Sequence, residues 1–185
     1  LSVEHKLGLH ASPTCVLSYG DAGEGAVGYL LGEEHQGMRY MFKMMNNARL
    51  GVGVEGLAVS ERSIQLASDY AQERRQGRAV GSPAGEQSLI IDHADVRRML
   101  LTMRAYTDAM RGVLYLNAAC LDIARNHSDE DVAQAASDRA ELLTPISKGW
   151  CTDIGCEMTS IGIQVHGGYG YIEETGAAQH FRDAR

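Results

Sequence analysis

The segment QVHGGYG, residues 164 to 170, has the residue types of a ligand-binding turn. Glycine lacks a side chain, so the backbone N–H groups of Gly167, Gly168 and Gly170, which follow Gln164, can approach a ligand closely. Glycine is also a common residue at the end of a helix, where it adopts a left-handed conformation. The spacing alone therefore leaves two interpretations open, a ligand-binding segment and a helix stop.

Ionisable residues lie on both sides of these glycines. His166 precedes them, and Glu173 and Glu174 follow them. A histidine with a carboxylate can act as general acid and base. No nucleophile or metal ligand accompanies them in the sequence, and acidic residues are also favoured in the first turn of a helix. We therefore expect loop and cap roles for these three residues.

Two other groups of polar residues fall on predicted helices. Arg74, Arg75 and Arg78 could hold a pyrophosphate, because guanidinium groups match phosphate geometry. They could equally neutralise the C-terminal end of a helix. Asn46 and Arg49 are three residues apart and share one helix face. That pair either reaches a polar ligand or lies on exposed surface.

Length and composition are those of one globular domain. The chain has 185 residues, of which 44% are hydrophobic and 22% are charged. The net charge of −7 disfavours a nucleic acid as partner, because binding a phosphate backbone needs a basic face. No apolar run approaches the roughly 20 residues that span a bilayer. We expect a cytoplasmic protein with no membrane span.

Cysteines and histidines show no metal-binding spacing. The four cysteines form no CxxC pair, and the seven histidines form no HxH or HxxxH pattern. Structural and catalytic zinc sites commonly use such close pairs. We therefore expect no metal site, and reduced cysteines with a structural role, as in a cytosolic protein.

The hydrophobic pattern changes near residue 34. Short apolar runs separated by Gly, Ser, Pro and Asp fill residues 1 to 31, which is typical of strands and turns. Two or three strands do not make a stable sheet by themselves. Residues 1–33 are therefore predicted to be the remnant of a larger β-domain, and residues 34–185 a helical domain.

Apolar residues in the helical domain recur with the period of an α-helix. This spacing predicts a mainly α fold, an antiparallel helical bundle. Gly77 would end the first helix and Asp92 would cap the second. Thr144 and Pro145 would start a new helix, since proline is favoured at the first helical position. The expected helices cover residues 36–76, 92–126, 128–143, 145–166 and 174–183, with a loop at 77–87 and the cap sequence SDED at 128–131. The expected core positions of the first helix are Leu50, Val54, Leu57, Ile64 and Ala71, with Val52, Val59, Leu66 and Tyr70 beside them.

Several linked stretches resemble the acyl-CoA dehydrogenase family, in the same order. They are KLGLHASPTCVLSYGDA, LGEEHQGMRYMFKMMNNARLGVG, YAQERRQGR and QVHGGYGYIEETGAAQHFRDAR, and together they span nearly the whole chain. DHADVRRMLLTMRAY and the loop before it resemble the longer bacterial branch of the family. The resemblance implies the last strands of a middle β-domain followed by most of a C-terminal four-helix bundle.

The same resemblance implies a function. Family members are homotetramers that bind FAD and usually oxidise acyl-CoA thioesters to the 2-enoyl form. They pass the electrons to electron-transfer flavoprotein or a similar acceptor. FAD, an acyl-CoA substrate and a homo-oligomer, dimer or tetramer, are therefore expected for this sequence.

The resemblance also assigns cofactor contacts. Arg74 matches an arginine that contacts the FAD pyrophosphate of a neighbouring subunit, and His93 matches a residue near the same cofactor. The segment that receives the adenosine-side phosphates is matched by Gln164, Gly167, Gly168 and Gly170.

The implied substrate contacts lie on the first helix. Arg49 matches an arginine that helps hold the acyl-CoA, and Asn46 stands where some members carry Asp. In most members the catalytic base is a Glu a few residues beyond the segment that matches residues 182–185. Another branch places that Glu immediately before the matching arginine, where this sequence has Ala48. The resemblance thus implies that these 185 residues contain no catalytic base and lack the loops around the flavin ring.

Three other functions stay open. An acyl-CoA oxidase has the same fold and differs in how fast its reduced flavin reacts with O₂. A non-catalytic helical assembly module and a DNA-binding relative are further alternatives, and the net charge of −7 disfavours the second of these.

Overall fold

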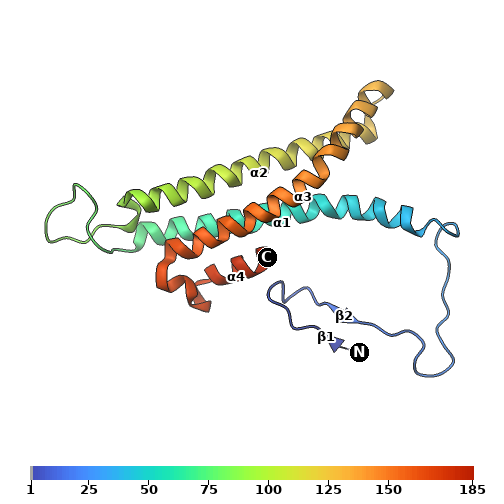
Figure 1. The fold of residues 1–185 in the computed structure, drawn as a ribbon, viewed down its shortest axis with the longest axis horizontal. Helices are drawn as coiled ribbons and strands as arrows, with labels where there is room; N and C mark the ends of the chain where they lie inside the picture. Colours follow the sequence, from blue (N-terminus) through green and yellow to red (C-terminus); the bar gives the residue numbers. More distant parts are fainter. Residues whose placement is uncertain (1) are drawn as a thin grey trace.

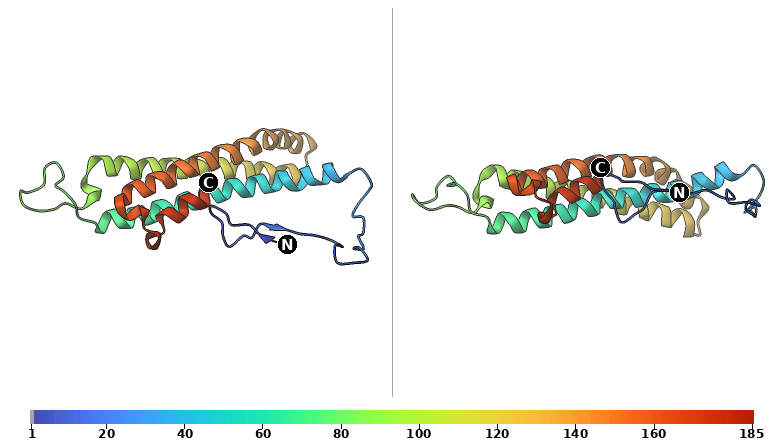
Figure 2. Two further views of the ribbon diagram at one scale, coloured as in Figure 1. Left: turned by 60° about the horizontal axis from the view of Figure 1, so that its bottom comes forward. Right: turned by 90° about the horizontal axis from the view of Figure 1, so that it is seen from below.

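The computed structural model describes residues 2 to 185 and shows a long, mainly α-helical molecule (Figure 1). The helices α1, α2 and α3 lie along the long axis, α2 running antiparallel to both α1 and α3, and the short α4 lies against α1 and α3 (Figure 2). The predicted antiparallel helical bundle is therefore confirmed. The elements are β1 (Ser2–Val3), β2 (Cys15–Val16), α1 (Gly37–Glu73), η1 (Ile90–Asp92), α2 (Ala94–Asn126), α3 (Glu130–His166), η2 (Gly167–Tyr171), η3 (Glu173–Thr175) and α4 (Ala177–Ala184), where η denotes a 3₁₀ turn.

The N-terminal segment, residues 2–36, forms only a minimal sheet. β1 pairs antiparallel with β2, with Ser2 opposite Val16. Residues 26–31, one of the short apolar runs typical of strands, form no strand. A strand needs a neighbouring backbone to satisfy its N–H and C=O groups, and Val27 and Tyr29 are exposed here instead.

Small residues bring α1 and α3 into close contact. A Cβ added to Gly56 would lie 2.5 Å from the backbone oxygen of Cys151, and one added to Gly155 would lie 3.1 Å from the oxygen of Gly56. Of the nine core positions expected on α1, Leu57, Ile64 and Ala71 are fully buried, whereas Val54 is 46% exposed. The expectation favoured large apolar side chains, but the contact surface consists largely of small ones. The fully buried residues of α1 are Gly53, Gly56, Leu57, Ser60, Ser63, Ile64, Ala67 and Ala71.

The prediction of separate helices on either side of Thr144-Pro145 is wrong. α3 continues through both residues as one helix. Pro145 cannot donate the helical hydrogen bond to the oxygen of Glu141, but Glu141 and Pro145 are both exposed, so water can bind that oxygen instead. Thr144 meanwhile donates its hydroxyl to the oxygen of Ala140 at 2.7 Å.

Several predicted helix ends also shift. α1 ends at Glu73 rather than near residue 76, because Arg74 already has extended backbone. The N-cap of α2 is His93, while Asp92 lies in η1 and forms an ion pair with Arg97 at 3.5 Å. The helix expected at 174–183 is divided into η3 and α4 by Gly176, whose φ is +78°.

The cap predicted within residues 128–131 is confirmed. Asp129 is the N-cap of α3, and its carboxylate accepts hydrogen bonds from the backbone N–H groups of Asp131 and Val132, at 3.0 and 3.2 Å. The loop predicted at residues 77–87 is confirmed as well, since it contains no helix or strand.

Candidate functional site

A cavity of about 360 Å³ lies at the end of the bundle where α1 ends, α2 begins and α3 ends. We call it the Arg74 pocket. It contains four residues that the sequence assigned to cofactor binding: Arg74, His93, Gln164 and Gly167. Its remaining lining residues are Tyr70, Gln76, Gly77, Ile90, Val96, Val165 and His166.

Arg74 is held by the end of α1. Its backbone N–H donates to the oxygen of Tyr70 at 2.9 Å, and its own oxygen accepts from Ile90 N at 2.8 Å. The guanidinium carbon lies 5.6 Å from the centre of the Tyr169 ring. A cation over an aromatic face is attracted by the ring quadrupole, so the charge of Arg74 is positioned beside the pocket.

His93 is fixed by the base of the loop between α1 and α2. Its Nε2 lies 2.9 Å from the oxygen of Gln76, so this nitrogen donates and Nδ1 is left for another partner. Gln76 N and Ser88 O form a hydrogen bond of 3.0 Å, and Ser88 N donates to the oxygen of Gly77 at 3.0 Å. These bonds close the loop and hold His93 at its base.

The sequence predicted a loop or cap role for His166. It is instead the last residue of α3, and it is only 5% exposed. Its Nδ1 donates to the oxygen of Gly162 at 2.7 Å, and its ring stacks on Tyr70 with 4.6 Å between centroids. Its position directly before the glycines suggested a cap. Its burial depends on Tyr70 of another helix, which spacing along the chain does not reveal.

The three glycines have different roles. Gly167 ends α3 with φ of +60°, and its N–H donates to the oxygen of Gln164, yet it also lines the pocket. The helix-stop interpretation of Gly167 is therefore confirmed, and the ligand-binding interpretation stays a prediction. Gly168 has open space where a Cβ would be, with no described atom within 4 Å outside its own chain neighbours. Gly170 packs on α3, because an added Cβ would lie 2.5 Å from the oxygen of Ile163. Gly168 and Gly170 do not line the pocket.

The Arg74 pocket is lined by basic side chains and by no acidic ones among the described residues. Its described lining contains Arg74 and two histidines but no aspartate or glutamate. Arg75 instead donates to the oxygen of Gln87 at 3.0 Å, and Arg78 lies outside the lining, so the arginine cluster is divided. A pocket whose described lining offers cationic and neutral donors and no carboxylate is suited to an anion.

Asn46 and Arg49 lie far from this pocket. Arg49 Nη1 donates to Asn46 Oδ1 at 3.0 Å, and both line a hollow of about 690 Å³ between the N-terminal half of α1 and the connected ends of α2 and α3. Lys43 and Arg125 also line it, with Glu141 as the carboxylate. The sequence analysis missed both cations. Lys43 is three residues before Asn46 and so shares its helix face, but Arg125 belongs to α2 and only the fold brings it near.

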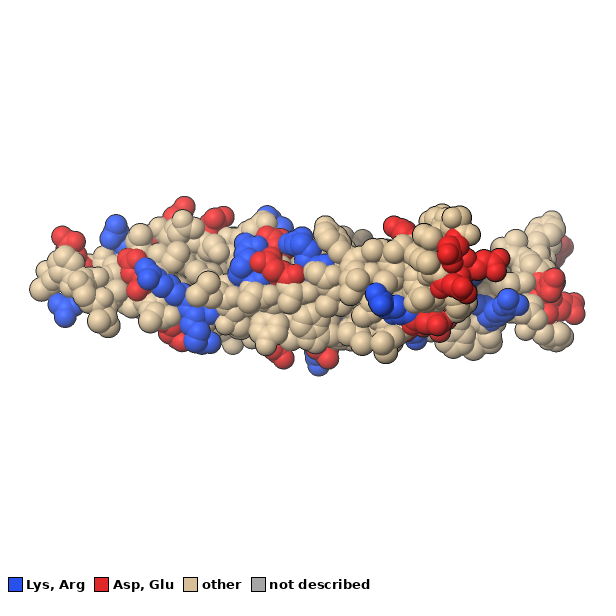
Figure 3. Space-filling model, turned by 90° about the horizontal axis from the view of Figure 1, so that it is seen from above, with Lys and Arg blue, Asp and Glu red and all other residues tan. Residues whose placement is uncertain are grey.

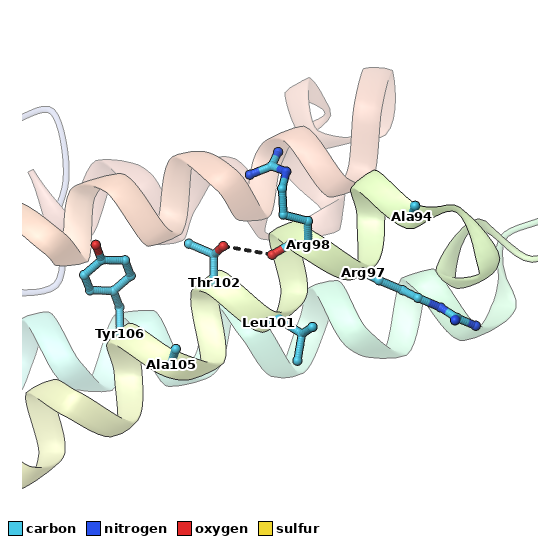
Figure 4. A pocket seen from close by; sticks show the side chains of 7 residues that line it. All are labelled: Ala94, Arg97, Arg98, Leu101, Thr102, Ala105 and Tyr106. Atoms are coloured by element: carbon cyan, nitrogen blue, oxygen red, sulfur yellow. Dashed lines mark hydrogen bonds between the residues drawn. The ribbon is translucent and has the colours of Figure 1, made fainter.

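A third hollow is a groove along α2 alone (Figure 4). Its lining runs from Ala94 to Tyr106, and the Thr102 hydroxyl donates to the oxygen of Arg98 at 2.8 Å. No second element contributes a polar group to it. On the face shown in Figure 3, acidic side chains gather in the half that holds the α2–α3 turn, opposite the end that holds the Arg74 pocket.

Glu173 forms a bidentate ion pair with Arg182, with both N···O distances at 2.8 Å. This hydrogen bonding lowers the pKa of Glu173 and raises the pKa of Arg182. The pair ties η3 to α4, which supports the expectation of a structural role for Glu173.

Neither a metal cluster nor a membrane helix is found in the part of the chain that the structure describes. Residues 2–185 contain no group of three or more His, Cys, Asp or Glu side chains placed to hold a metal ion. None of the helices in that range combines the length and the apolar character needed to cross a bilayer.

Comparison with known proteins gives consistent matches. Residues 35–185 match the family described as "Acyl-CoA dehydrogenase, C-terminal domain". The chain is 50% identical, over all 185 residues, to 3-methylmercaptopropionyl-CoA dehydrogenase of Ruegeria pomeroyi, and 35% identical, over 99% of its length, to a butyryl-CoA dehydrogenase of Syntrophomonas wolfei. It spans only 31% of the length of each of these relatives. Among solved structures, Caenorhabditis elegans ACDH-11 in complex with C11-CoA matches 98% of the chain with a TM-score of 0.81 and 26% identity, over 28% of its own chain.

Proposed function

Because the chain belongs to the acyl-CoA dehydrogenase family, we propose that it is the C-terminal portion of an FAD-dependent enzyme that oxidises acyl-CoA to 2-enoyl-CoA. The observation that carries this proposal is the Arg74 pocket. Residues from three helix ends line it, and its described lining contains no carboxylate. FAD, when bound, supplies the hydride acceptor of the reaction. The residues described here hold and orient the ligands.

The Arg74 pocket fits the phosphate end of a dinucleotide. The Arg74 guanidinium offers charge and paired donors, which suit phosphate oxygens. The Gln164 amide and the free Nδ1 of His93 provide neutral partners in the same cavity. Gly168 leaves its backbone uncovered beside the pocket. In the proposed assembly, a dimer or tetramer, the FAD comes from a neighbouring subunit.

The hollow around Asn46 and Arg49 is the proposed acyl-CoA contact. The bond from Arg49 to Asn46 fixes the guanidinium direction. Lys43 and Arg125 add positive charge, which suits a coenzyme A phosphate. Removing the C2 proton requires a carboxylate base, and we propose that it comes from outside these 185 residues. Residues 1–33 would belong to a β-domain. Electron-transfer flavoprotein or a similar protein would accept the electrons, and the reaction would take place in the cytoplasm.

Calorimetric titration of the chain with ADP and with FAD tests the cofactor pocket. Weak binding is expected, since only the phosphate-end contacts are present. Arg74→Gln should weaken it by about tenfold or more, because hydrogen bonds to charged groups contribute roughly 1.5–3 kcal/mol. Arg78→Gln is the matched control, as Arg78 is nearby but outside the pocket lining. Equal affinities for both variants, or no binding by the unaltered chain, would count against the proposed pocket.

Because the proposed catalytic base lies outside these residues, we also predict that the 185-residue chain is inactive by itself. With added FAD, acyl-CoA and an artificial electron acceptor, acceptor reduction should stay at background, because the proposed catalytic base and flavin-ring loops do not belong to these 185 residues. Acyl-CoA-dependent reduction above background would contradict this.

A further inference from the structure

The polar anchors of α4 lie near its C-terminal end. Asp183 Oδ1 accepts from the backbone N–H of Leu9 at 2.7 Å, and Cys156 Sγ donates to the oxygen of Ala184 at 3.1 Å. Arg182, which precedes Asp183 in sequence, binds Glu173 of η3. Within residues 177–184, only Ala177 is fully buried. With so little apolar burial, the docking of α4 is sensitive to the state of any polar group beneath it.

His180 is such a group. It is half-buried, and its Nδ1 is buried without a hydrogen-bond partner among the described residues. Arg62 of α1 and His166 of α3 act on it as positive or potentially positive groups, and Asp183 of α4 is the opposing carboxylate.

The other elements packed on α4 offer His180 little compensation. Residues 167–171 of η2, with the sequence GGYGY, carry no charged side chain. Glu173 of η3 is already neutralised by Arg182, and the N-terminal segment places His10 next to Glu173. A cation at His180 would therefore face Arg62 with Asp183 as its one carboxylate, which the backbone N–H of Leu9 already occupies.

Protonation of His180 is unfavourable while α4 is docked. It would place an N–H on the buried Nδ1, where the described residues provide no acceptor. Burial, and then the Arg62 charge, lower the pKa of His180 below its ordinary value of 6.5. An imidazole exposed to water keeps the ordinary value, so the undocked helix binds the proton more strongly. Lower pH must then shift the equilibrium toward the undocked form.

We propose that His180 is a pH-sensitive latch, whose protonation releases α4 from α1 and α3. Release would break the Leu9–Asp183 bond and free the N-terminal segment. It would also loosen η2, which packs on α4 and starts at Gly167 of the Arg74 pocket. This latch does not depend on the identity of any ligand, so it can fail or hold independently of the proposed function.

Hydrogen–deuterium exchange of the peptide covering residues 177–184 tests the latch. Rates are corrected for the intrinsic effect of pH and compared between pH 7.5 and 5.5. The opening equilibrium should increase as pH falls, by up to about tenfold per pH unit for one proton. Amides in the middle of α2, residues 99–114, should show no such change. An α4 opening equilibrium that is constant over this range would overturn the proposal.

Three variants locate the effect. His180→Gln should abolish the pH dependence, while the exposed His5→Gln should leave it unchanged. Arg62→Gln should reduce it, because removing the nearby cation makes the docked imidazole easier to protonate. If His180→Gln leaves α4 undocked at every pH, Arg62→Gln decides the question. A pH dependence unchanged in Arg62→Gln, or retained in a docked His180→Gln protein, would refute the latch.

Discussion

At the scale of single residues, Gly56 sets the distance between two long helices. The backbone of α3 approaches so closely that no side chain fits, since an added Cβ would lie 2.5 Å from the oxygen of Cys151. The obstacle is backbone, which cannot move aside as a flexible side chain can. Glycine at this position is therefore required by packing, in spite of its low helix propensity.

Gly56→Ala should lower the free energy of unfolding by about 1–3 kcal/mol, the usual cost of overpacking. Gly51→Ala is the matched control on the same helix. Gly51 is exposed, with no described atom within 4 Å of an added Cβ beyond its own helix, so alanine there should stabilise by about 0.5–1 kcal/mol. Urea unfolding followed by circular dichroism measures both. Destabilisation of equal size at both positions would show that the close contact has no effect.

The buried thiol of Cys151 predicts a pH dependence of stability. Burial raises its pKa to about 11, from 9.0 in the unfolded chain. Between these values the unfolded chain loses a proton that the folded chain keeps, so stability is lost as pH rises through this window. The stability difference between the unaltered protein and Cys151→Ala should shrink by about 1 kcal/mol from pH 8 to pH 10. The exposed Cys15→Ala should show no such trend in urea unfolding.

At the scale of elements, the cap of α3 shows how the start of a helix is fixed. One carboxylate, that of Asp129, accepts from two backbone N–H groups of the first turn. Asp129→Ala should cost about 1 kcal/mol, whereas Ser128→Ala should have an effect within about 0.5 kcal/mol, as is usual for exposed positions. Thermal unfolding of the two variants provides the comparison. A larger loss from Ser128→Ala would contradict the assignment of the cap.

Much of the Arg74 pocket was predictable from topology. Arg74, His93 and Gln164 lie near the end of α1, the start of α2 and the end of α3, and an antiparallel bundle brings those three ends together. Lys43 and Asn46, three residues apart, shared a predictable helix face. Arg125 and the stacking of His166 on Tyr70 needed the contact between different helices, which no pattern within one helix contains.

Local patterns were ambiguous wherever tertiary contacts decided the outcome. The Asp129 cap was predictable because its hydrogen bonds stay within three residues. Thr144-Pro145 has the sequence of a helix start, but the packing of α3 against α1 and α2 outweighs one lost backbone hydrogen bond. Likewise, the burial of small residues on α1 depends on how closely α3 approaches, and hydrophobicity does not report that distance.

At the scale of the whole molecule, a large apolar surface is unpaired in the described chain. Tyr29 and Leu31 of the N-terminal segment are both 87% exposed, and Met38, Phe42 and Met44 at the start of α1 are 45–63% exposed. Contiguous apolar patches of more than a few hundred Å² are uncommon on monomers. The isolated chain should therefore associate, as a dimer or tetramer, since closed symmetric contacts are the common outcome.

Sedimentation velocity at several micromolar concentrations measures this association. Tyr29→Ser combined with Leu31→Ser should shift the distribution toward the monomer. Arg78→Gln, a polar change in the loop at the opposite end of α1, should leave it unchanged. A single monomeric species of the unaltered chain at all concentrations would disprove the association.

The hydrogen bond between Leu9 and Asp183 joins positions 174 residues apart, which has a consequence for the order of folding. Residues 127–129 connect α2 to α3, so that pair forms by closing a short loop with little loss of chain entropy. The Leu9 contact requires nearly the whole chain to be in place, and distant contacts of this kind form slowly. The N-terminal segment is therefore the last part to attach during folding. It is also the first to be exposed to a protease when the molecule opens locally.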